Sequence, residues 1–385
     1  MRRVAVKERP DWRQRAQACG FFYHTPDGEP YWDETACYAF SLKEIEDDLE
    51  AATRALQSMC LEVAARAVAD ERVLARLAVP ERFWDFVAAS LKRGDRGLYG
   101  RFDLCYDGAG PAKLLEYNAD TPTSVLETAV FQWGWLEDAM ALGIIASGAD
   151  QFNSLHDRLI EGWKAFGHGR TVHFAGLLDA PEDAGTLTYL ADTAEQAGVA
   201  TRLVAMEDIG LARDGRFVDG TNRAIEVAFK LYPWEWMFQE EFGAALPHAP
   251  TLWIEPPWKA ILSNKGILPL LWEMFEGHPN LLPSFFEDDP RAAVLSGSFV
   301  SKPLHSREGA NVEIVRSGEV IAAGDGPYGN APRVVQAIAP LPVFAGNHTV
   351  LGSWWAGGAP AGLSVRESAG PVTTNTSRFL PHAIV

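Results

Sequence analysis

The chain has 385 residues, of which 47% are hydrophobic and 22% are charged, and its formal net charge is −17. This length allows about two or three domains with a sizeable core. The acidic balance argues against nucleic acid as a partner, because phosphate binding needs a basic face, and it is compatible with a cationic partner such as an amine.

The sequence does not indicate export or insertion into a membrane. Its first residues, MRRVAVKERPDW, are charged and lack the apolar run of a signal peptide. No stretch approaches the roughly 18 apolar residues that a membrane-spanning helix needs. The cysteines are scattered without zinc-like spacing, which is typical of reduced thiols. We therefore expect a cytoplasmic chain without a membrane partner.

The N-terminal part is predicted to be irregular and then helical. Residues 1–40 are aromatic and interrupted by proline and glycine. Ser41 begins a predicted helix over 41–71, because Glu44 completes a capping box and apolar residues follow at helical spacing. Pro80 opens a second predicted helix, and both helices are expected to brace the strands that follow.

Residues 98–124 predict a β-hairpin with a polar face. Alternating residues on either side of the Gly-Ala-Gly-Pro at 108–111 indicate two strands joined by a tight turn. Residues that pair, and residues two apart, share one face of a sheet. If Asp107 pairs with Ala112, the further pairs are Cys105 with Leu114, Asp103 with Glu116, and Arg101 with Asn118. The opposite, core-facing side then carries Phe102, Leu104, Leu115 and Tyr117.

The polar face of this hairpin combines a cation with two opposed carboxylates. Asp103 and Glu116 repel each other unless a cation lies between them or one is protonated. With Asn118 they offer oxygens that suit Mg²⁺, which also keeps water and phosphate oxygens in its shell. Arg101 adds a fixed fork for an anion. The alternatives are a solvent-facing strand with an incidental ion pair, or a hydrolase that uses the two carboxylates as acid and base.

A helix is predicted next, and from residue 153 helices and strands alternate. The predicted helices span 125–140, 154–166 and 186–198, and the predicted strands span 171–178, 200–206 and 224–232. This order is typical of a three-layer α/β unit with a mostly parallel sheet. Glu182 and Asp183 follow the first of these strands, where such sheets bind ligands. They are also explained as charges in the first turn of a helix, which is the interpretation that we favour.

The last third is predicted to be mainly antiparallel, so the fold class is mixed α/β and α+β. A strand, a turn around Lys265 and a helix are expected over 261–275, followed by a helix-like segment at 290–295. Further strands are expected around Lys302, on either side of the Ser-Gly turn at 317–318, and over 334–344 and 349–368. A glycine-containing loop lies at 305–312.

Two lysines and this loop each have a structural and a functional interpretation. Lys302 shares a strand face with Val300 and Leu304, where a lysine either extends to solvent or meets a buried phosphate. Lys265 lies at a turn, where solvation is the ordinary explanation. The loop at 305–312 could present backbone N–H groups to phosphates. The sequence contains neither a P-loop motif nor the glycine motif of a Rossmann fold.

Several spaced motifs together resemble the glutathionylspermidine synthase family, and more closely its stand-alone members that lack an amidase domain. These motifs are GRFDLC, LLEYNADTPTS, SNKGILPLLWEMF, VSKPLHSREGAN and the region from Gln336 to Arg366. The resemblance implies an ATP-grasp-type ligase fold with a preceding α/β, pre-ATP-grasp-like domain. It implies three parts: N-terminal helices with the metal-binding hairpin at 1–150, a substrate-side α/β domain at 151–250, and a nucleotide-binding portion at 251–385.

The resemblance also implies roles for individual residues. Asp103, Glu116 and Asn118 would hold Mg²⁺, and Arg101 would contact the reacting phosphate and carboxylate. The ATP-binding residues would be Lys265 and Lys302 for the phosphates, Glu308 and Gly309 in the covering loop, and Gln336 in the pocket. Arg366 would stabilise charge in the transition state. The implied activity is an ATP- and Mg²⁺-dependent ligase that joins a peptide-like carboxylate, such as glutathione, to an amine, such as a polyamine, through an acyl phosphate.

The sequence departs from the family pattern at two places that concern the substrates. No acidic side chain follows Glu367, although the family uses one there to meet the polyamine. Leu231 stands where the family places a hydroxyl residue against glutathione. The alternative function is a catalytically silent ATP-binding regulatory protein of the same fold, and the complete set of charged residues argues against it.

Overall fold

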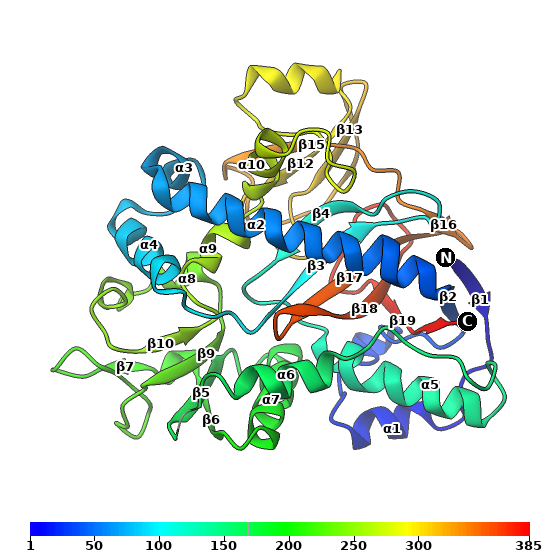
Figure 1. The fold of residues 1–385 in the computed structure, drawn as a ribbon, viewed down its shortest axis with the longest axis horizontal. Coiled ribbons are helices and arrows are strands. Elements are labelled where there is room, and N and C mark those ends of the chain that lie inside the picture. The colour runs from blue at the N-terminus through cyan, green and yellow to red at the C-terminus, as the bar shows by residue number, and fades with distance from the viewer. Residues whose placement is uncertain (168) are drawn as a thin grey trace.

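The computed structural model describes residues 1–167 and 169–385, and within them the strands form five sheets. The central sheet contains the predicted hairpin, and its strand order is β19-β18-β17-β3-β4, with β16 beside β17 (Figure 1). All of its pairings are antiparallel. Its strands are β3 (Tyr99–Cys105), β4 (Lys113–Asn118), β16 (Val343–Phe344), β17 (Asn347–Ala356), β18 (Ala359–Ser368) and β19 (Arg378–Leu380). Residues near 110 and near 360 therefore share one sheet.

The predicted register of the hairpin is confirmed at its polar end and wrong near its turn. Arg101 pairs with Asn118 and Asp103 with Glu116, as expected. Beyond them the register shifts by one residue, so that Leu114 pairs with Leu104 rather than with Cys105. Leu115 is the extra residue of this β-bulge. As a result Leu114, and not Leu115, is fully buried in the core, while Leu115 is half-buried at a cavity.

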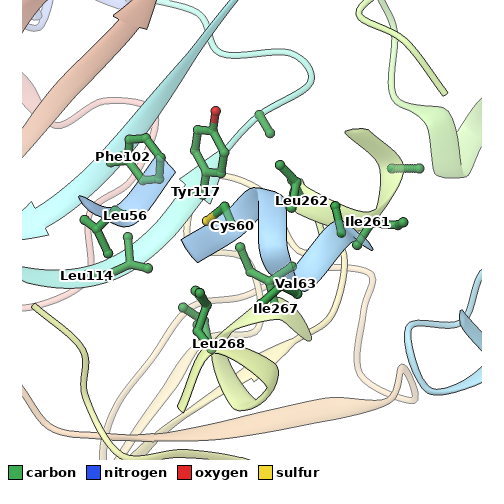
Figure 2. Close-up of a cluster of buried hydrophobic side chains, with 14 of the residues drawn as sticks. Leu56, Cys60, Val63, Phe102, Leu114, Tyr117, Ile261, Leu262, Ile267 and Leu268 are labelled. Carbon is green, nitrogen blue, oxygen red and sulfur yellow. The ribbon is translucent and has the colours of Figure 1, made fainter. Parts of the chain in front are cut away.

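Helix α2 (Ala51–Ala69) packs across the core face of the hairpin, which confirms its bracing role. Figure 2 shows Leu56 and Cys60 of α2 beside Phe102 and Tyr117, whose rings stack with centroids 3.8 Å apart. The predicted capping box is present, because the Glu44 N–H donates to Ser41 Oγ and the Ser41 N–H donates to Glu44 Oε2. The helical stretch that follows, Glu44–Glu50, has π geometry before α2 begins. Helices α3 (Glu71–Arg76) and α4 (Trp84–Arg93) pack against α2, whereas α5 (Gln132–Ala141) packs against the strand at His382–Ile384.

A second antiparallel sheet has the order β11-β15-β12-β13-β14. Its strands are β11 (Ser284–Phe286), β12 (Phe299–Pro303), β13 (Glu313–Arg316), β14 (Glu319–Ala323) and β15 (Arg333–Ala337). The predicted turn between β13 and β14 is confirmed, and Ser317 and Gly318 both have positive φ, as a tight hairpin requires. The predicted antiparallel character of the last third is thus confirmed.

The strand that we predicted just before Lys265 is wrong, because that segment is helical. It forms α9 (Lys259–Leu262), and α10 (Ile267–Met274) follows the turn. Pro256 and Pro257 fix the backbone in a helix-compatible conformation, and their carbonyls accept the first hydrogen bonds of the new turn. The apolar residues at 261–262 did not by themselves indicate that a helix begins at Lys259.

The predicted parallel sheet is confirmed, with the order β10-β9-β5-β6. Its elements are α6 (Leu155–Trp163), β5 (Thr171–Gly176), α7 (Pro181–Gln196), β6 (Ala200–Ala205), β9 (Val227–Leu231), α8 (Trp234–Met237) and β10 (Leu252–Ile254). The short hairpin β7 (Gly210–Leu211) with β8 (Phe217–Val218), and strand β10, were not predicted.

Residues 1–40 are more regular than we expected. They contain β1 (Arg2–Ala5), α1 (Trp12–Ala18) and β2 (Ala36–Phe40). Strand β2 lies between β1 and the C-terminal strand β20 (His382–Ile384), so the two chain ends lie close together (Figure 1). The pairing of β2 with β20 joins segments more than 340 residues apart, so no local sequence pattern predicts it. Among the described residues, no helix is both long and apolar enough to cross a bilayer.

Candidate active site

The polar face of the hairpin is a connected network of charged side chains. Arg101 binds Asp103 with two hydrogen bonds, from Nε to Oδ1 at 2.6 Å and from Nη2 to Oδ2 at 3.0 Å. Its remaining terminal nitrogen donates to the Thr123 carbonyl at 3.1 Å. Asn118 Nδ2 lies 3.1 Å from Asp103 Oδ2 and 3.2 Å from Glu116 Oε1. The alternation of β3 and β4 therefore brings all four predicted residues together.

The surroundings shift the pKa values of the two carboxylates of this network in opposite directions. Burial raises the pKa of Asp103, and the nearby charge of Glu116 raises it further, although Arg101 opposes both effects. Burial also disfavours the charge of Glu116, but Lys265 and Lys302 outweigh it and lower the Glu116 pKa to about 2. A further positive charge beside two neighbouring buried carboxylates would stabilise the ionised form of both.

Lys265 and Lys302 reach the hairpin from separate elements. Lys265, in the turn between α9 and α10, lies 3.0 Å from Glu116 Oε2 and donates to the Ser306 carbonyl at 2.5 Å. Lys302, on β12, donates to the Leu115 carbonyl at 2.8 Å and to Gln336 Oε1 at 2.7 Å. Burial lowers the Lys302 pKa to about 8. Lys265 is thus buried, rather than solvated as its turn position suggested.

The loop at 305–312 packs against the loop between β18 and β19, residues 369–377, which we call the C-terminal loop. Glu308 and Gly309 have φ of 53° and 75°. A Cβ on Gly309 would lie 2.6 Å from the Thr373 carbonyl oxygen, so only glycine permits this approach. Arg307 fixes the loop, because it donates to Thr121 Oγ1 at 2.7 Å and to Glu235 Oε1 at 3.1 Å.

Arg366, on β18, lies on the side of the site that is formed by the C-terminal loop. Its Nε donates to the Ser377 carbonyl at 3.0 Å, and Nη2 donates to the carbonyls of Thr374 and Asn375 at 3.2 and 3.1 Å. Its guanidinium carbon lies 5.0 Å from the centre of the Tyr31 ring. Arg366 therefore ties the C-terminal loop to the central sheet, and Nη1 makes no hydrogen bond within the described residues.

Two cavities meet at the hairpin. The first, which we call the apolar cavity, has a volume of about 470 Å³, lies between the two antiparallel sheets and is lined by side chains such as Val300, Ile314, Ile338 and Val350. The second, the polar cavity, has a volume of about 450 Å³ and faces the parallel sheet. Four residues line both: Asp103, Glu116, Gly309 and Thr373. All ten predicted site residues line one cavity or both; Lys265, Lys302 and Gln336 line the apolar one, and Arg101, Asn118, Glu308 and Arg366 the polar one.

The polar cavity contains charged residues whose place in the site we did not predict. Arg307 adds a third arginine to Arg101 and Arg366. Glu182 and Asp183 lie in the first turn of α7, as we favoured, and they also line this cavity, so a ligand-binding role stays a prediction. Burial, followed by the charge of Glu182, raises the Asp183 pKa to about 6. The position of Glu182 and Asp183 after a parallel strand was the signal that deserved more weight.

Comparisons with known proteins agree with this architecture. Residues 3–385 match the family model described as glutathionylspermidine synthase preATP-grasp. The "Putative acid--amine ligase" of Haemophilus influenzae is 40% identical over 400 residues, with all of both chains covered. A trypanothione synthetase of Crithidia fasciculata is 29% identical over 352 residues, and the bifunctional glutathionylspermidine synthetase/amidase of Escherichia coli is 26% identical over 368 residues. These matches cover 84% and 88% of this chain, but only 53% and 58% of those relatives.

A solved structure supports the fold alone. The glutathione synthetase-like effector of Globodera pallida superimposes with a TM-score of 0.57 over 98% of both chains, at 13% identity. The expected mixed α/β architecture of ATP-grasp type is therefore confirmed. Fold and matches together define an enzyme of the class that joins an acid to an amine. Within that class, the chain belongs to the glutathionylspermidine synthase family.

Proposed function

We propose that the chain is an ATP- and Mg²⁺-dependent ligase that converts a carboxylate into an acyl phosphate and transfers the acyl group to a cationic amine. The observation that carries this proposal is the meeting of two cavities at Asp103 and Glu116. The apolar cavity suits a nucleotide, and the polar cavity offers arginines for an acid and carboxylates for an amine. The reacting groups would approach the hairpin from opposite sides.

The donor set of the hairpin fits Mg²⁺. One oxygen each of Asp103 and Glu116 lies within 3.2 Å of Asn118 Nδ2, so the two carboxylates converge on one point, and a turn of the amide would bring its oxygen there. No group of three or more His, Cys, Asp or Glu side chains within residues 1–167 and 169–385 forms a closed metal site. Two carboxylates and an amide suit an ion that keeps water and phosphate oxygens as its other ligands. Bound there, Mg²⁺ would neutralise charge on the reacting phosphates.

The apolar cavity supplies what ATP requires. Lys302 and Lys265 place two buried ammonium groups at its inner end, next to the hairpin. Gln336 orients Lys302 and also donates to the Leu114 carbonyl at 3.1 Å, so its amide is fixed at the cavity wall. The loop of Glu308 and Gly309 would cover the phosphates. The γ-phosphate would then point to the boundary with the polar cavity.

The polar cavity combines arginines with carboxylates, and Arg307 lies close to both Asp183 and Glu308. A substrate carboxylate bound by Arg101 and Arg307 would attack the γ-phosphorus, and ADP would leave as the acyl phosphate forms. Arg101 would bind the phosphoryl oxygens through the fork that now holds Asp103. Glu182, Asp183 and Glu308 would hold the ammonium group of the amine. Asp183 would take one proton from this ammonium group, and the neutral amine would attack the acyl carbon. The bond from carbon to the phosphate oxygen would then break, and the second proton would leave nitrogen with the departing phosphate.

These residues also indicate the substrates. The carboxylates of the polar cavity, Glu182, Asp183 and Glu308, would replace the missing acidic side chain after Glu367, so a cationic amine remains the expected acceptor. The names of the relatives add glutathione and polyamine chemistry as the first substrates to test. Leu231 lines the polar cavity and makes that part of it apolar.

Release of ADP in the presence of Mg²⁺ tests this function. Carboxylates (glutathione, its fragments and other small peptides) are crossed with amines that include spermidine. We expect ADP only when an acid and an amine are both present, and collapse of turnover in Glu116→Gln with little change in stability. Glu319→Gln is the matched control, because Glu319 is exposed on β14. Tight ATP binding without turnover across the panel would favour the silent regulatory alternative, and turnover unchanged by Glu116→Gln would exclude the metal assignment.

A further inference from the structure

A third cavity lies behind the hairpin, away from its polar face. Its volume is about 590 Å³, which is larger than that of the apolar or the polar cavity, and we call it the rear cavity. Tyr117 lines it, and because Tyr117 stands between Glu116 and Asn118 on β4, its side chain points to the opposite face of the sheet. None of the ten predicted site residues, all of which the structure describes, lines the rear cavity.

Two hydrogen bonds at the floor of the rear cavity anchor the two strands of the hairpin. Tyr117 OH, from β4, donates to Oε1 of Gln57 on α2 at 2.9 Å. Lys259 Nζ, at the start of α9, donates to the carbonyl of Tyr99 on β3 at 2.7 Å. Lys259 is also paired with Glu255 at 2.5 Å, and Glu255 accepts from the Tyr99 N–H at 3.0 Å. Gln57 and Lys259 line the cavity, so a molecule bound there would touch both anchors.

The ring of Tyr117 transmits this contact to the strand that carries Arg101. A Cβ on Gly100 would lie 2.8 Å from the Tyr117 hydroxyl oxygen, so only glycine leaves room for the ring across β3. The ring also stacks on Phe102, with centroids 3.8 Å apart (Figure 2). Gly100 and Phe102 flank Arg101 in the sequence. A displacement of Tyr117 would therefore reach the backbone next to Arg101.

The polar groups that face the rear cavity without a partner are hydrogen-bond donors. Gln57 is only 7% exposed, yet its Nε2 has no acceptor within the described residues. The indole N–H of Trp355 and the guanidinium of Arg96 likewise find no acceptor in the part of the chain that the structure describes. In contrast, the rim carboxylates Asp95 and Glu161 each form an ion pair with a neighbouring basic side chain.

This lining defines the chemistry of a ligand. Lysine has three donors, and two of those on Lys259 are occupied by Tyr99 and Glu255, so one remains for a ligand. A molecule that completes the cavity must therefore supply acceptors, and a carboxylate supplies the strongest ones. The apolar remainder of the lining suits a flat ring. It consists of Leu61, Leu91, Leu98, Phe166, Trp258 and the ring of Trp355.

We propose that the rear cavity is a regulatory site for an aromatic carboxylate, and that the bound carboxylate is coupled to the polar face of the hairpin through Tyr117. The ring would lie among the aromatic side chains, and the carboxylate would accept from Gln57 and Lys259. A ligand that restrains Tyr117 also restrains Glu116 and Asn118 on either side of it, so ATP with Mg²⁺ should bind more tightly. The binding of the carboxylate stands apart from the proposed function, whereas its coupling rests on it.

Two probes with the same ring and opposite charge test the site. They are 2-naphthoate and 2-naphthylmethylammonium, titrated by calorimetry. The net charge of −17 favours the cation everywhere else on the protein, so we expect at least about tenfold tighter binding of 2-naphthoate only if the rear cavity takes it. Ala165→Phe fills the cavity and should abolish this binding, and Arg96→Gln at the rim should weaken it about threefold. Arg213→Gln removes an exposed arginine outside the cavity and should leave the affinity unchanged.

A preference for the cation would overturn the site. So would 2-naphthoate binding that is unchanged in both Ala165→Phe and Arg96→Gln, because it would place the probe in another cavity.

The coupling is measured as the Kd for ATP in the presence of Mg²⁺, with and without saturating 2-naphthoate. In the unmodified protein the Kd should fall at least about fivefold. In Tyr117→Phe the probe should still bind, but the Kd for ATP should no longer respond, because the hydroxyl contact with Gln57 is lost. No response in the unmodified protein, or an equal response in Tyr117→Phe, would overturn the coupling. If ATP does not bind at all, the ligase proposal fails, and the binding of 2-naphthoate is decided by the first experiment alone.

Discussion

Lys265 Nζ lies 3.0 Å from Glu116 Oε2, so the turn before α10 is joined by an ion pair to strand β4 of the hairpin. The same carboxylate accepts from Asn118 through its other oxygen. In the proposed reaction both groups would change partners. Lys265 and Lys302 would bind phosphate oxygens, and Glu116 would bind Mg²⁺. The ion pair would therefore hold both side chains in place until the nucleotide binds.

Removal of Lys302 should weaken ATP binding more than it weakens the fold. Lys302 is buried, and its hydrogen-bond partners among the described residues are neutral: the Leu115 carbonyl and Gln336. A phosphate would add a direct anionic partner. In Lys302→Met we expect the KM for ATP to rise at least about tenfold, because a charge-assisted hydrogen bond is lost. The measurement is KM for ATP together with the thermal midpoint. An unchanged KM for ATP would contradict the role of Lys302.

Gly309→Ala should impair turnover through contact between two loops. Its Cβ would meet the Thr373 carbonyl at 2.6 Å, and its φ of 75° is unfavourable for alanine. We expect kcat to fall about tenfold or more, because the loop at 305–312 can no longer close on its neighbour. Gly329→Ala is the control, since a Cβ there has no atom within 4 Å. Equal kcat values for the two variants would show that turnover does not need the close contact between Gly309 and the Thr373 carbonyl.

The buried ion pair between Lys230 and Asp120 should be important for stability only as a pair. Lys230 is 0% exposed and Asp120 is 1% exposed, and Asp120 also accepts from the Trp234 N–H at 3.1 Å. Lys230→Met leaves a buried carboxylate alone and should lower the free energy of unfolding by about 3–5 kcal/mol. The double variant Asp120→Asn/Lys230→Met should recover much of this loss. Urea unfolding measures both, and a double variant as unstable as the single one would contradict the explanation.

His382 should make stability depend on pH. Its ring is fully buried, Nε2 accepts from the Phe152 N–H at 3.2 Å, and Nδ1 donates to Gln132 at 2.9 Å, so the neutral form is the bonded one. Burial lowers its pKa from 6.5 to about 3. The unfolded chain therefore binds a proton that the folded chain does not, and stability is lost as the pH falls below about 6.5. Between pH 7 and pH 5 this one group should contribute a loss of about 2 kcal/mol.

The contribution of His382 is measured as a difference between variants. Free energies of unfolding at pH 7 and pH 5 are compared for the unmodified protein, for His382→Gln, and for His248→Gln as an exposed control. His382→Gln should have a smaller loss on acidification than the other two. An identical loss in all three would assign the pH dependence to other groups.

Much of the candidate site could be predicted from the sequence, because successive side chains of a β-strand alternate strictly between the two faces of the sheet. Arg101, Asp103, Glu116 and Asn118 share a face in any register that pairs Asp103 with Glu116, and alternation alone selected that register. The β-bulge at Leu115 could not be predicted, because an extra residue changes pairing without changing local composition. The core therefore receives Leu114 where we expected Leu115.

What the sequence could not show depends on contacts between distant segments. Strand β2 exists because β1 and β20 flank it, and the carboxylates of the polar cavity meet because the first turn of α7 and the loop of Glu308 both line it. Glu182 and Asp183 therefore looked like ordinary helix charges. The division into parts at 1–150, 151–250 and 251–385 stays a prediction, as do the catalytic roles of individual residues.

The transfer of oxygen from the acid to phosphate tests the central claim most directly. The acid substrate is labelled with ¹⁸O in its carboxylate and incubated with ATP, Mg²⁺ and the amine, and the released phosphate is analysed by mass spectrometry. An acyl phosphate requires one ¹⁸O atom to appear in each phosphate, because the carboxylate oxygen that attacked phosphorus leaves with it. Phosphate without the label, formed while amide product accumulates, would contradict the proposed mechanism.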